Sequence, residues 1–114
     1  MQELGTFYAR GIRPVVFVLI NDGYTVERIL QNPKADYQDI VQWNWTELPS
    51  GLGGTNVRTA KVSTVRELRD ALQGASDPEH AWLIEVVLPR MDVPRLLAEL
   101  ARGRSAANAA ASKR

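Results

Sequence analysis

The run of six apolar residues from Val15 to Ile20 constrains the fold more than any other part of the sequence. Four of the six side chains are β-branched, and such side chains favour extended backbone. The run is continuous rather than alternating, which is typical of a strand buried on both faces of a parallel sheet. It is also far too short to span a bilayer. The run therefore predicts a core strand.

The rest of the chain alternates strands with helices. Residues 57–62 alternate like a weaker strand, and residues 81–88 form a second apolar run closed by proline. Helices are predicted before Gly11, over residues 24–31, after the capping-box pair Thr64 and Glu67, and after Asp92. This alternation predicts an α/β fold in which a parallel sheet is flanked by helices.

Length and composition exclude several classes of protein. The 114 residues allow one small domain at most, predicted at residues 1–102, with a disordered tail at residues 103–114. The net charge of +1 does not indicate binding to nucleic acid or to an anionic membrane. The absence of cysteine excludes disulfides and thiolate chemistry. The N-terminus lacks a signal-peptide layout, so a cytoplasmic location is expected.

The turn after the first strand holds the residues best suited to chemistry. In parallel sheets ligands bind at the carboxyl ends of the strands, and the first such end is Asn21-Asp22-Gly23. The turn offers an amide oxygen and free carbonyls, which are hard ligands that magnesium takes. Glu27 follows in the first turn of the next helix. The same pattern also fits an ordinary turn and a glutamate that favours the helix dipole, and spacing alone leaves both interpretations open.

A family resemblance bears on that choice. The stretch Asn-Asp-Gly-Tyr-Thr-Val-Glu at residues 21–27, with the apolar run before it, resembles the second half of the thiamine-diphosphate motif of pyruvate and indolepyruvate decarboxylases. The likeness continues through Tyr-Gln-Asp-Ile at 37–40, Trp-Asn-Trp-Thr-Glu-Leu-Pro at 43–49 and Glu-Val-Val-Leu-Pro at 85–89. It implies the C-terminal part of a thiamine-diphosphate-binding domain.

The resemblance implies a role for each matching residue. Asn21 would give its side-chain oxygen to Mg²⁺ and Gly23 its backbone carbonyl, and the metal would hold the diphosphate of the cofactor. Glu27 would be the catalytic carboxylate that assists decarboxylation and delivers a proton. Val26 would line the substrate pocket. The implied reaction releases an aldehyde and CO2 from a 2-keto acid of the indolepyruvate, phenylpyruvate or broad keto acid type.

Two departures from the family pattern stand beside these roles. Ile20 occupies the position of the first asparagine of the family's Asn-Asn pair, and the Gly-Asp-Gly half of the motif, with its metal-binding aspartate, does not occur in the chain. The pyrimidine-binding domain is absent too, and in this family the site forms between subunits of a homo-oligomer. The isolated chain is therefore expected to be inactive.

Two alternatives remain open at this stage. The chain could be a non-catalytic remnant or subunit-pairing module, or it could come from another thiamine-diphosphate enzyme such as a carboligating synthase. Glu27 disfavours the synthase, because carboligases of the acetolactate type generally lack this glutamate. The arginines at the end of the chain, Arg90 among them, are interpreted as a solvated face.

Overall fold

The computed structural model describes residues 2–32 and 34–111. The chain divides into two compact units. The first unit comprises Met1–Ile20 and Trp43–Leu88, and the second comprises Asn21–Gln42 and Pro89–Arg114.

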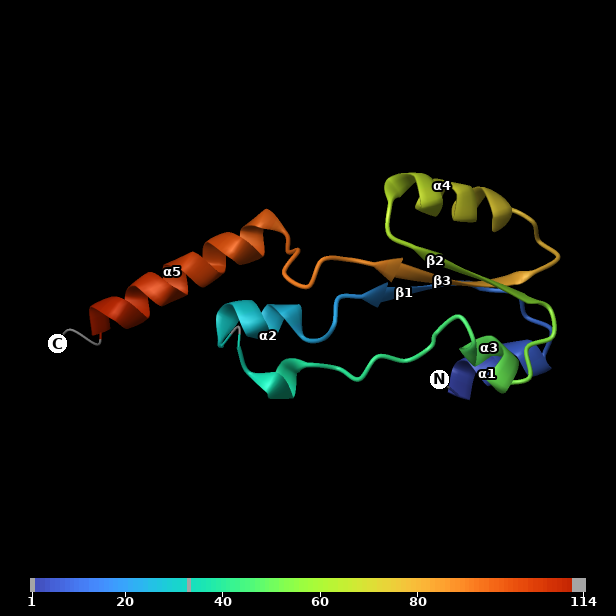
Figure 1. Ribbon diagram of the computed structural model, residues 1–114, viewed down its shortest axis with the longest axis horizontal. Coiled ribbons are helices and arrows are strands. Elements are labelled where there is room, and N and C mark those ends of the chain that lie inside the picture. Colours follow the sequence, from blue (N-terminus) through green and yellow to red (C-terminus); the bar gives the residue numbers. More distant parts are fainter. Residues whose placement is uncertain (1, 33, 112–114) are drawn as a thin grey trace. The chain divides into compact units, whose positions relative to one another are not determined.

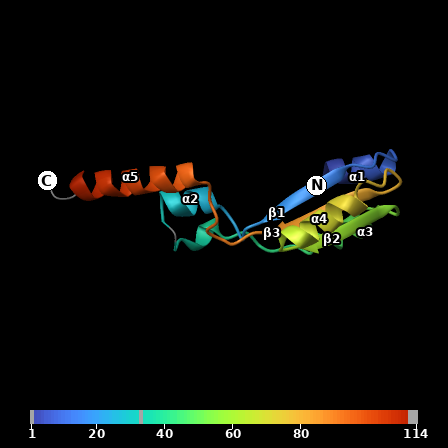
Figure 2. The same cartoon turned by 90° about the horizontal axis from the view of Figure 1, so that it is seen from above.

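A parallel sheet of three strands organises the first unit. The strands are β1 (Val15–Ile20), β2 (Val57–Val62) and β3 (Ala81–Val87), and their order in the sheet is β1-β3-β2. Both outer strands pair in parallel with β3 (Figure 2). The predicted α/β class with a parallel sheet flanked by helices is therefore confirmed.

Helix α4 (Val65–Gly74) covers one face of this sheet. Figure 1 shows α4 on one side of the strands, with α1 (Gln2–Ala9) and the short α3 (Leu48–Gly51) on the other. The buried core beneath α4 draws on β2, β3 and α4 and consists of Val62, Ala71, Trp82 and Ile84. Gly74 permits this packing, because a Cβ there would lie 2.9 Å from the Trp82 ring.

The predicted start and stop signals of two helices are confirmed. Thr64 Oγ1 accepts from the Glu67 N–H at 3.2 Å, and the Glu67 carboxylate accepts from the Thr64 N–H at 3.0 Å, which completes the capping box of α4. Gly11, at φ 68°, ends α1. The Ile12 N–H donates to the Phe7 carbonyl at 2.9 Å, the pairing of a Schellman C-cap.

Strand β1 is not buried on both faces, and this part of the prediction is wrong. Val15, Phe17 and Leu19 are 41%, 47% and 63% exposed. They stand in register with Trp82, Ile84 and Val86, so they lie on the face that α4 covers. The core on that face is built from β2, β3 and α4, and β1 is an edge strand. A continuous apolar run identifies a strand but not its place in the sheet.

The second unit is formed by helices and turns. It contains α2 (Thr25–Leu30), the 3₁₀ helix η1 (Asp36–Gln38) and α5 (Arg95–Ala111), and α2 contacts both of the others. Together with the turn that precedes α2, these elements hold every residue singled out for catalysis or metal binding.

The ends of α5 differ from the prediction. Asp92 lies in the loop before the helix, where its N–H donates to the Pro89 carbonyl at 3.0 Å, and α5 begins at Arg95. At the other end the helix runs on through residues 103–111, for which a disordered tail was predicted. Alanine occupies five of these nine positions and has the strongest helix propensity, which favours a helix even without an apolar stripe. Residues 112–114 lie outside the described part.

Membrane-spanning helices are not found among the residues that the structure describes, since none of their helices combines the required length with the required hydropathy.

Candidate active site

The three residues that follow β1 form a turn that only particular side chains can adopt. Asp22 has φ 60° and Gly23 has φ 138°, and both values lie in the region that disfavours ordinary side chains. A short polar residue such as aspartate tolerates the left-handed region. At Gly23 a Cβ would lie 2.0 Å from the Gln38 carbonyl oxygen, so a glycine is required there.

Arg28 holds this turn from inside the unit. Its side chain is fully buried, and Nη2 donates to the Asp22 carbonyl at 2.8 Å and to the Gln38 carbonyl at 3.1 Å. The same nitrogen pairs with the carboxylate of Asp39. A buried guanidinium is costly unless it is paired and hydrogen-bonded, and all three contacts of Arg28 are made by Nη2, while Nε and Nη1 have no partner within the described residues.

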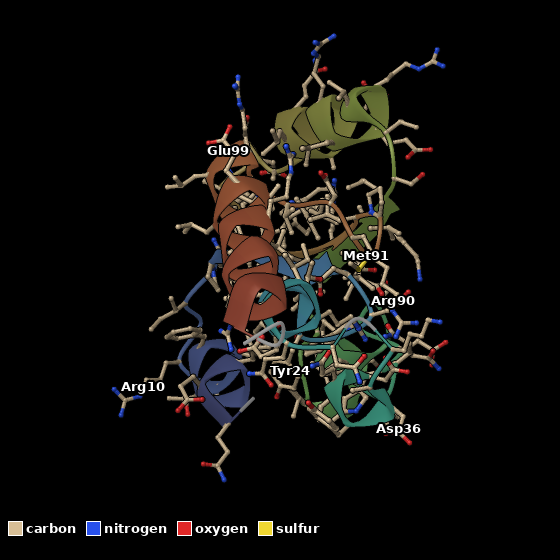
Figure 3. All side chains as sticks on the ribbon, turned by 90° about the vertical axis from the view of Figure 1, so that its left-hand side faces the viewer. Arg10, Tyr24, Asp36, Arg90, Met91 and Glu99 are labelled. Carbon is tan, nitrogen blue, oxygen red and sulfur yellow. The ribbon has the colours of Figure 1, made fainter. Side chains whose placement is uncertain are left out.

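The segment around η1 braces the turn on one side. The Tyr24 N–H donates to the Gln38 carbonyl at 2.9 Å, and Gly23 and Asp39 form an antiparallel bridge. Arg90, from the loop before α5, also pairs with the Asp39 carboxylate. Figure 3 shows Arg90 on the same side of this unit as Asp36 of η1. Three segments that are distant in sequence therefore meet at one carboxylate.

Hydrogen bonds determine which way the Asn21 amide faces. The Thr25 hydroxyl donates its one proton to the Arg90 carbonyl at 2.9 Å, so toward Asn21 it can only accept. The amide nitrogen of Asn21 donates to it at 3.1 Å. The amide oxygen of Asn21 is then directed away from Thr25, and it has no hydrogen-bond partner within the described part of the chain.

The oxygen atoms of this turn are suitable ligands for a hard cation. The Asn21 amide oxygen is available, and the Gly23 carbonyl accepts one hydrogen bond, from the Thr25 N–H at 3.1 Å, which leaves a second lone pair. Mg²⁺ takes oxygen ligands of this kind and completes its shell with water and phosphate oxygens. The described residues include no cluster of three histidine, cysteine, aspartate or glutamate side chains that could hold a metal by themselves.

Glu27 and Val26 lie on α2 directly after the turn. The Glu27 side chain is half-buried, and within the residues that the structure describes its carboxylate makes no hydrogen bond or ion pair. Val26 is 47% exposed. A catalytic carboxylate and a pocket-lining residue both need to be accessible, and these two side chains are.

Ile20 leaves the backbone of β1 intact at the position where the family carries asparagine. Its carbonyl accepts from the Leu88 N–H at 2.9 Å, so the pairing of β1 with the end of β3 continues to the last residue of the strand. The substitution does not interrupt the strand that leads into the turn.

The residues that brace the turn were missed by sequence reasoning. Arg28 and Asp39 carried no signal, because a single arginine in a short helix and a single aspartate in an irregular segment are usually solvated. Arg90 was interpreted as part of a solvated face, whereas its guanidinium pairs with Asp39. The only hint in the sequence was the Asn-Asp-Gly turn at residues 21–23, since the backbone carbonyls of a turn need hydrogen-bond partners.

Comparison with known proteins finds relatives for most of the chain. The chain is 52% identical over 101 residues to an alpha-keto-acid decarboxylase of Mycobacterium tuberculosis H37Rv, and the aligned region covers 88% of this chain. It is likewise 52% identical over 103 residues to the alpha-keto-acid decarboxylase of Mycobacterium avium strain 104, and 48% identical over 101 residues to that of Mycobacterium ulcerans. No family model matches the chain.

The matched region is a small part of each relative. The chain spans 18% of the length of these decarboxylases. The activity of the whole proteins is therefore proposed for this chain and is not shown by the match. The match nevertheless extends from the sheet through the turn to α5, and it agrees with the resemblance drawn from residues 21–27. By sequence the chain is therefore similar to about a fifth of the length of proteins named alpha-keto-acid decarboxylases.

Proposed function

We propose that this chain supplies one wall of the active site of a thiamine-diphosphate-dependent 2-keto acid decarboxylase, as the C-terminal part of a longer enzyme. The relatives are named alpha-keto-acid decarboxylases, which supports the reaction. The observation that carries the proposal is the orientation of the Asn21 amide, whose oxygen Thr25 leaves available for a cation.

In this proposal Asn21 and Gly23 contribute two oxygen ligands to Mg²⁺. The remaining positions of an octahedral shell would be taken by water, by diphosphate oxygens and by a ligand from outside this chain. Gly23 serves a second purpose, because its lack of a Cβ keeps the Gln38 carbonyl close to the turn. The metal and the turn would together hold the diphosphate end of the cofactor.

Glu27 would act as the acid–base group of the reaction. A 2-keto acid loses CO2 and takes up one proton at its former keto carbon, which yields the aldehyde. When bound, thiamine diphosphate supplies the electron sink for this step. Glu27 would deliver the proton to that carbon, and its accessible carboxylate has no competing partner within the described residues.

The substrate and the assembly follow from the resemblance alone. An indolepyruvate, phenylpyruvate or other broad keto acid is the proposed substrate, with Val26 lining its pocket. The enzyme is proposed to act as a cytoplasmic homo-oligomer, dimer or tetramer, without nucleic acid or membrane partners.

The test replaces the matching segment of the M. tuberculosis decarboxylase with this chain. The chimera is expected to release aldehyde and CO2 from a 2-keto acid only when Mg²⁺ and thiamine diphosphate are supplied. In Asn21→Ala the loss of a metal ligand should raise the concentrations of both that are needed, and an excess should restore part of the rate. Full activity after exhaustive chelation of the metal would contradict the proposal.

A second candidate function rests on the exposed face of β1. Val15, Phe17 and Leu19 present an apolar surface of the kind that pairs with another protein, which favours a non-catalytic subunit-pairing module. A folded chimera that turns over no 2-keto acid with saturating Mg²⁺ and cofactor would favour this function. A chimera that instead joins two keto acids, without releasing aldehyde, would favour the carboligating synthase.

A further inference from the structure

Asp39 connects two routes that both end at the turn proposed to bind Mg²⁺. The first runs through Arg28, which pairs with the Asp39 carboxylate and donates to the Asp22 carbonyl at 2.8 Å. The second runs through Arg90, which pairs with the same carboxylate. The backbone carbonyl of Arg90 accepts from the Thr25 hydroxyl at 2.9 Å, and Thr25 in turn orients Asn21.

We propose that Asp39 is a positioning residue for the metal site: through Arg28 it holds the backbone of the turn, and through Arg90 it fixes the direction of the Asn21 amide oxygen. The geometry of this network is independent of the reaction, whereas its purpose rests on the proposed function. Asp39 does not itself touch the metal or the cofactor in this proposal.

Burial and charge explain why a carboxylate is needed at this point. The Arg28 side chain is fully buried, while the Asp39 side chain is 50% exposed and the Arg90 side chain 46%. Both guanidinium groups pair with the same carboxylate, whose negative charge offsets the repulsion between the two like charges. Without the charge of Asp39, Arg90 would turn toward solvent and its backbone carbonyl would lose its restraint.

The consequence for Asn21 follows from the single proton of the Thr25 hydroxyl. While the Arg90 carbonyl accepts that proton, Thr25 presents only a lone pair to Asn21 and the amide nitrogen must face it. Once the carbonyl moves, the hydroxyl can turn and donate to the amide oxygen instead. The oxygen that would bind Mg²⁺ is then occupied for part of the time.

The first experiment measures the geometry in the full 114-residue chain, with Phe17→Thr in every sample to limit self-association through the exposed face of β1. Asp39→Asn keeps the shape of the side chain but removes its charge. In the variant the side-chain amide resonances of Asn21 should shift and exchange faster with solvent in NMR spectra. Asp36→Asn is the matched control, since it removes the same charge from the exposed first residue of η1 and should leave Asn21 unchanged. Unchanged Asn21 resonances in Asp39→Asn would overturn the proposal.

The second experiment uses the chimeric decarboxylase and separates positioning from folding. Asp39→Asn should raise the apparent dissociation constant for Mg²⁺ by about 10- to 100-fold, the usual effect of removing an outer-shell partner. Turnover at saturating Mg²⁺ and cofactor should stay close to that of the parent chimera. A purely structural role would lower the melting temperature and the active fraction without changing metal affinity, and that result would also overturn the proposal.

Substitutions of Thr25 test the same network independently, because a conservative variant should restore the Mg²⁺ affinity. Thr25→Val removes the hydroxyl and should raise the apparent Mg²⁺ constant as Asp39→Asn does, whereas Thr25→Ser should restore it. If decarboxylation by the parent chimera does not depend on Mg²⁺, the proposed function is contradicted. The NMR resonances of Asn21 in the isolated chain would still test the role of Asp39. Equal metal affinity in Thr25→Val and the parent would contradict the positioning route through Thr25.

Discussion

Gly23 shows how one residue determines whether the turn can exist. Its φ is 138°, and a Cβ on it would lie only 2.0 Å from the Gln38 carbonyl oxygen, so there is no space for a side chain. The Arg28 guanidinium closes the same space from another direction, at 2.5 Å. The turn, η1 and the buried arginine therefore depend on a single missing Cβ.

Gly23→Ala should lower the free energy of unfolding by more than the roughly 1–3 kcal/mol of a strained backbone conformation, because the methyl also collides with backbone. Urea denaturation of the chain followed by circular dichroism measures the change. Gly5→Ala in α1 is the control, since a Cβ there meets nothing within 4 Å. Equal stability of the two variants would show that the turn relaxes at little cost.

Glu27 carries the prediction about turnover. In the chimeric decarboxylase Glu27→Gln keeps the size of the side chain but cannot deliver the proton, so saturated turnover should fall by roughly two to four orders of magnitude. Cofactor affinity should barely change, since Glu27 is proposed to act at the substrate and not at the diphosphate. Stopped assays at saturating cofactor, together with cofactor titration, separate the two effects. Loss of cofactor with a normal saturated rate would show that the carboxylate is structural.

At the scale of elements, α4 is held at its start by the capping box. Backbone hydrogen bonding from Ser63, followed by side-chain contacts with Ser63 and Thr64, lowers the pKa of Glu67 below its ordinary value of 4.5. A depressed folded-state pKa means that this stabilisation is fully present above the unfolded pKa. It is lost as the pH falls through the folded value.

Lowering the pH from 7 to 3 should therefore destabilise α4, and Glu67→Gln should remove that part of the pH dependence. At pH 7, Thr64→Ala should cost about 1 kcal/mol because the cap is lost, while Thr64→Ser should cost little. Amide hydrogen exchange of the first turn of α4 measures both effects. If the stability of α4 depends on pH in the same way in Glu67→Gln and in the parent, then the capping carboxylate is not the cause of that dependence.

At the scale of the whole molecule, β1 leaves both an edge and an apolar face uncovered. Within the described part of the chain the strand pairs with β3 alone, and Val15, Phe17 and Leu19 are exposed. An edge strand of this kind is a template for pairing with another chain.

The isolated chain should therefore self-associate or aggregate at micromolar concentration. Phe17→Thr should reduce this, because threonine keeps the strand propensity and removes the aromatic surface. Leu96→Gln, which removes an exposed apolar residue from α5, is the control and should have less effect. Sedimentation velocity measures the distribution of species, and a single sharp monomer of the parent chain would contradict the prediction.

The isolated chain should also bind thiamine diphosphate weakly or not at all. By the proposal it would offer only two oxygen ligands to Mg²⁺, and magnesium gives up its water reluctantly to an incomplete site. Calorimetric titration of the chain with cofactor and Mg²⁺ tests this, with Asn21→Ala as the comparison. Tight, stoichiometric binding by the parent would mean that the turn forms a sufficient site by itself.

The elements were largely predictable because their signals are local. The three strands, the capping box of α4 and the glycine that ends α1 depend on residues within a few positions of one another. The parallel arrangement followed from the alternation of strands and helices. The extension of α5 beyond residue 102 was not predicted, because an alanine-rich stretch shows no apolar stripe, although its helix propensity is high.

The sequence by itself determined the local chemistry of this protein: a strand at Val15–Ile20, a polar turn that contains a glycine, and a glutamate on the helix that follows. Only the tertiary structure decided that β1 lies at the edge of the sheet, since strand order depends on pairings between distant segments. It also decided that Asp39 and Arg90 meet Arg28 behind the turn. Ion pairs between residues 11 and 51 positions apart produce no periodic pattern in the sequence, because each partner alone is an ordinary charged residue.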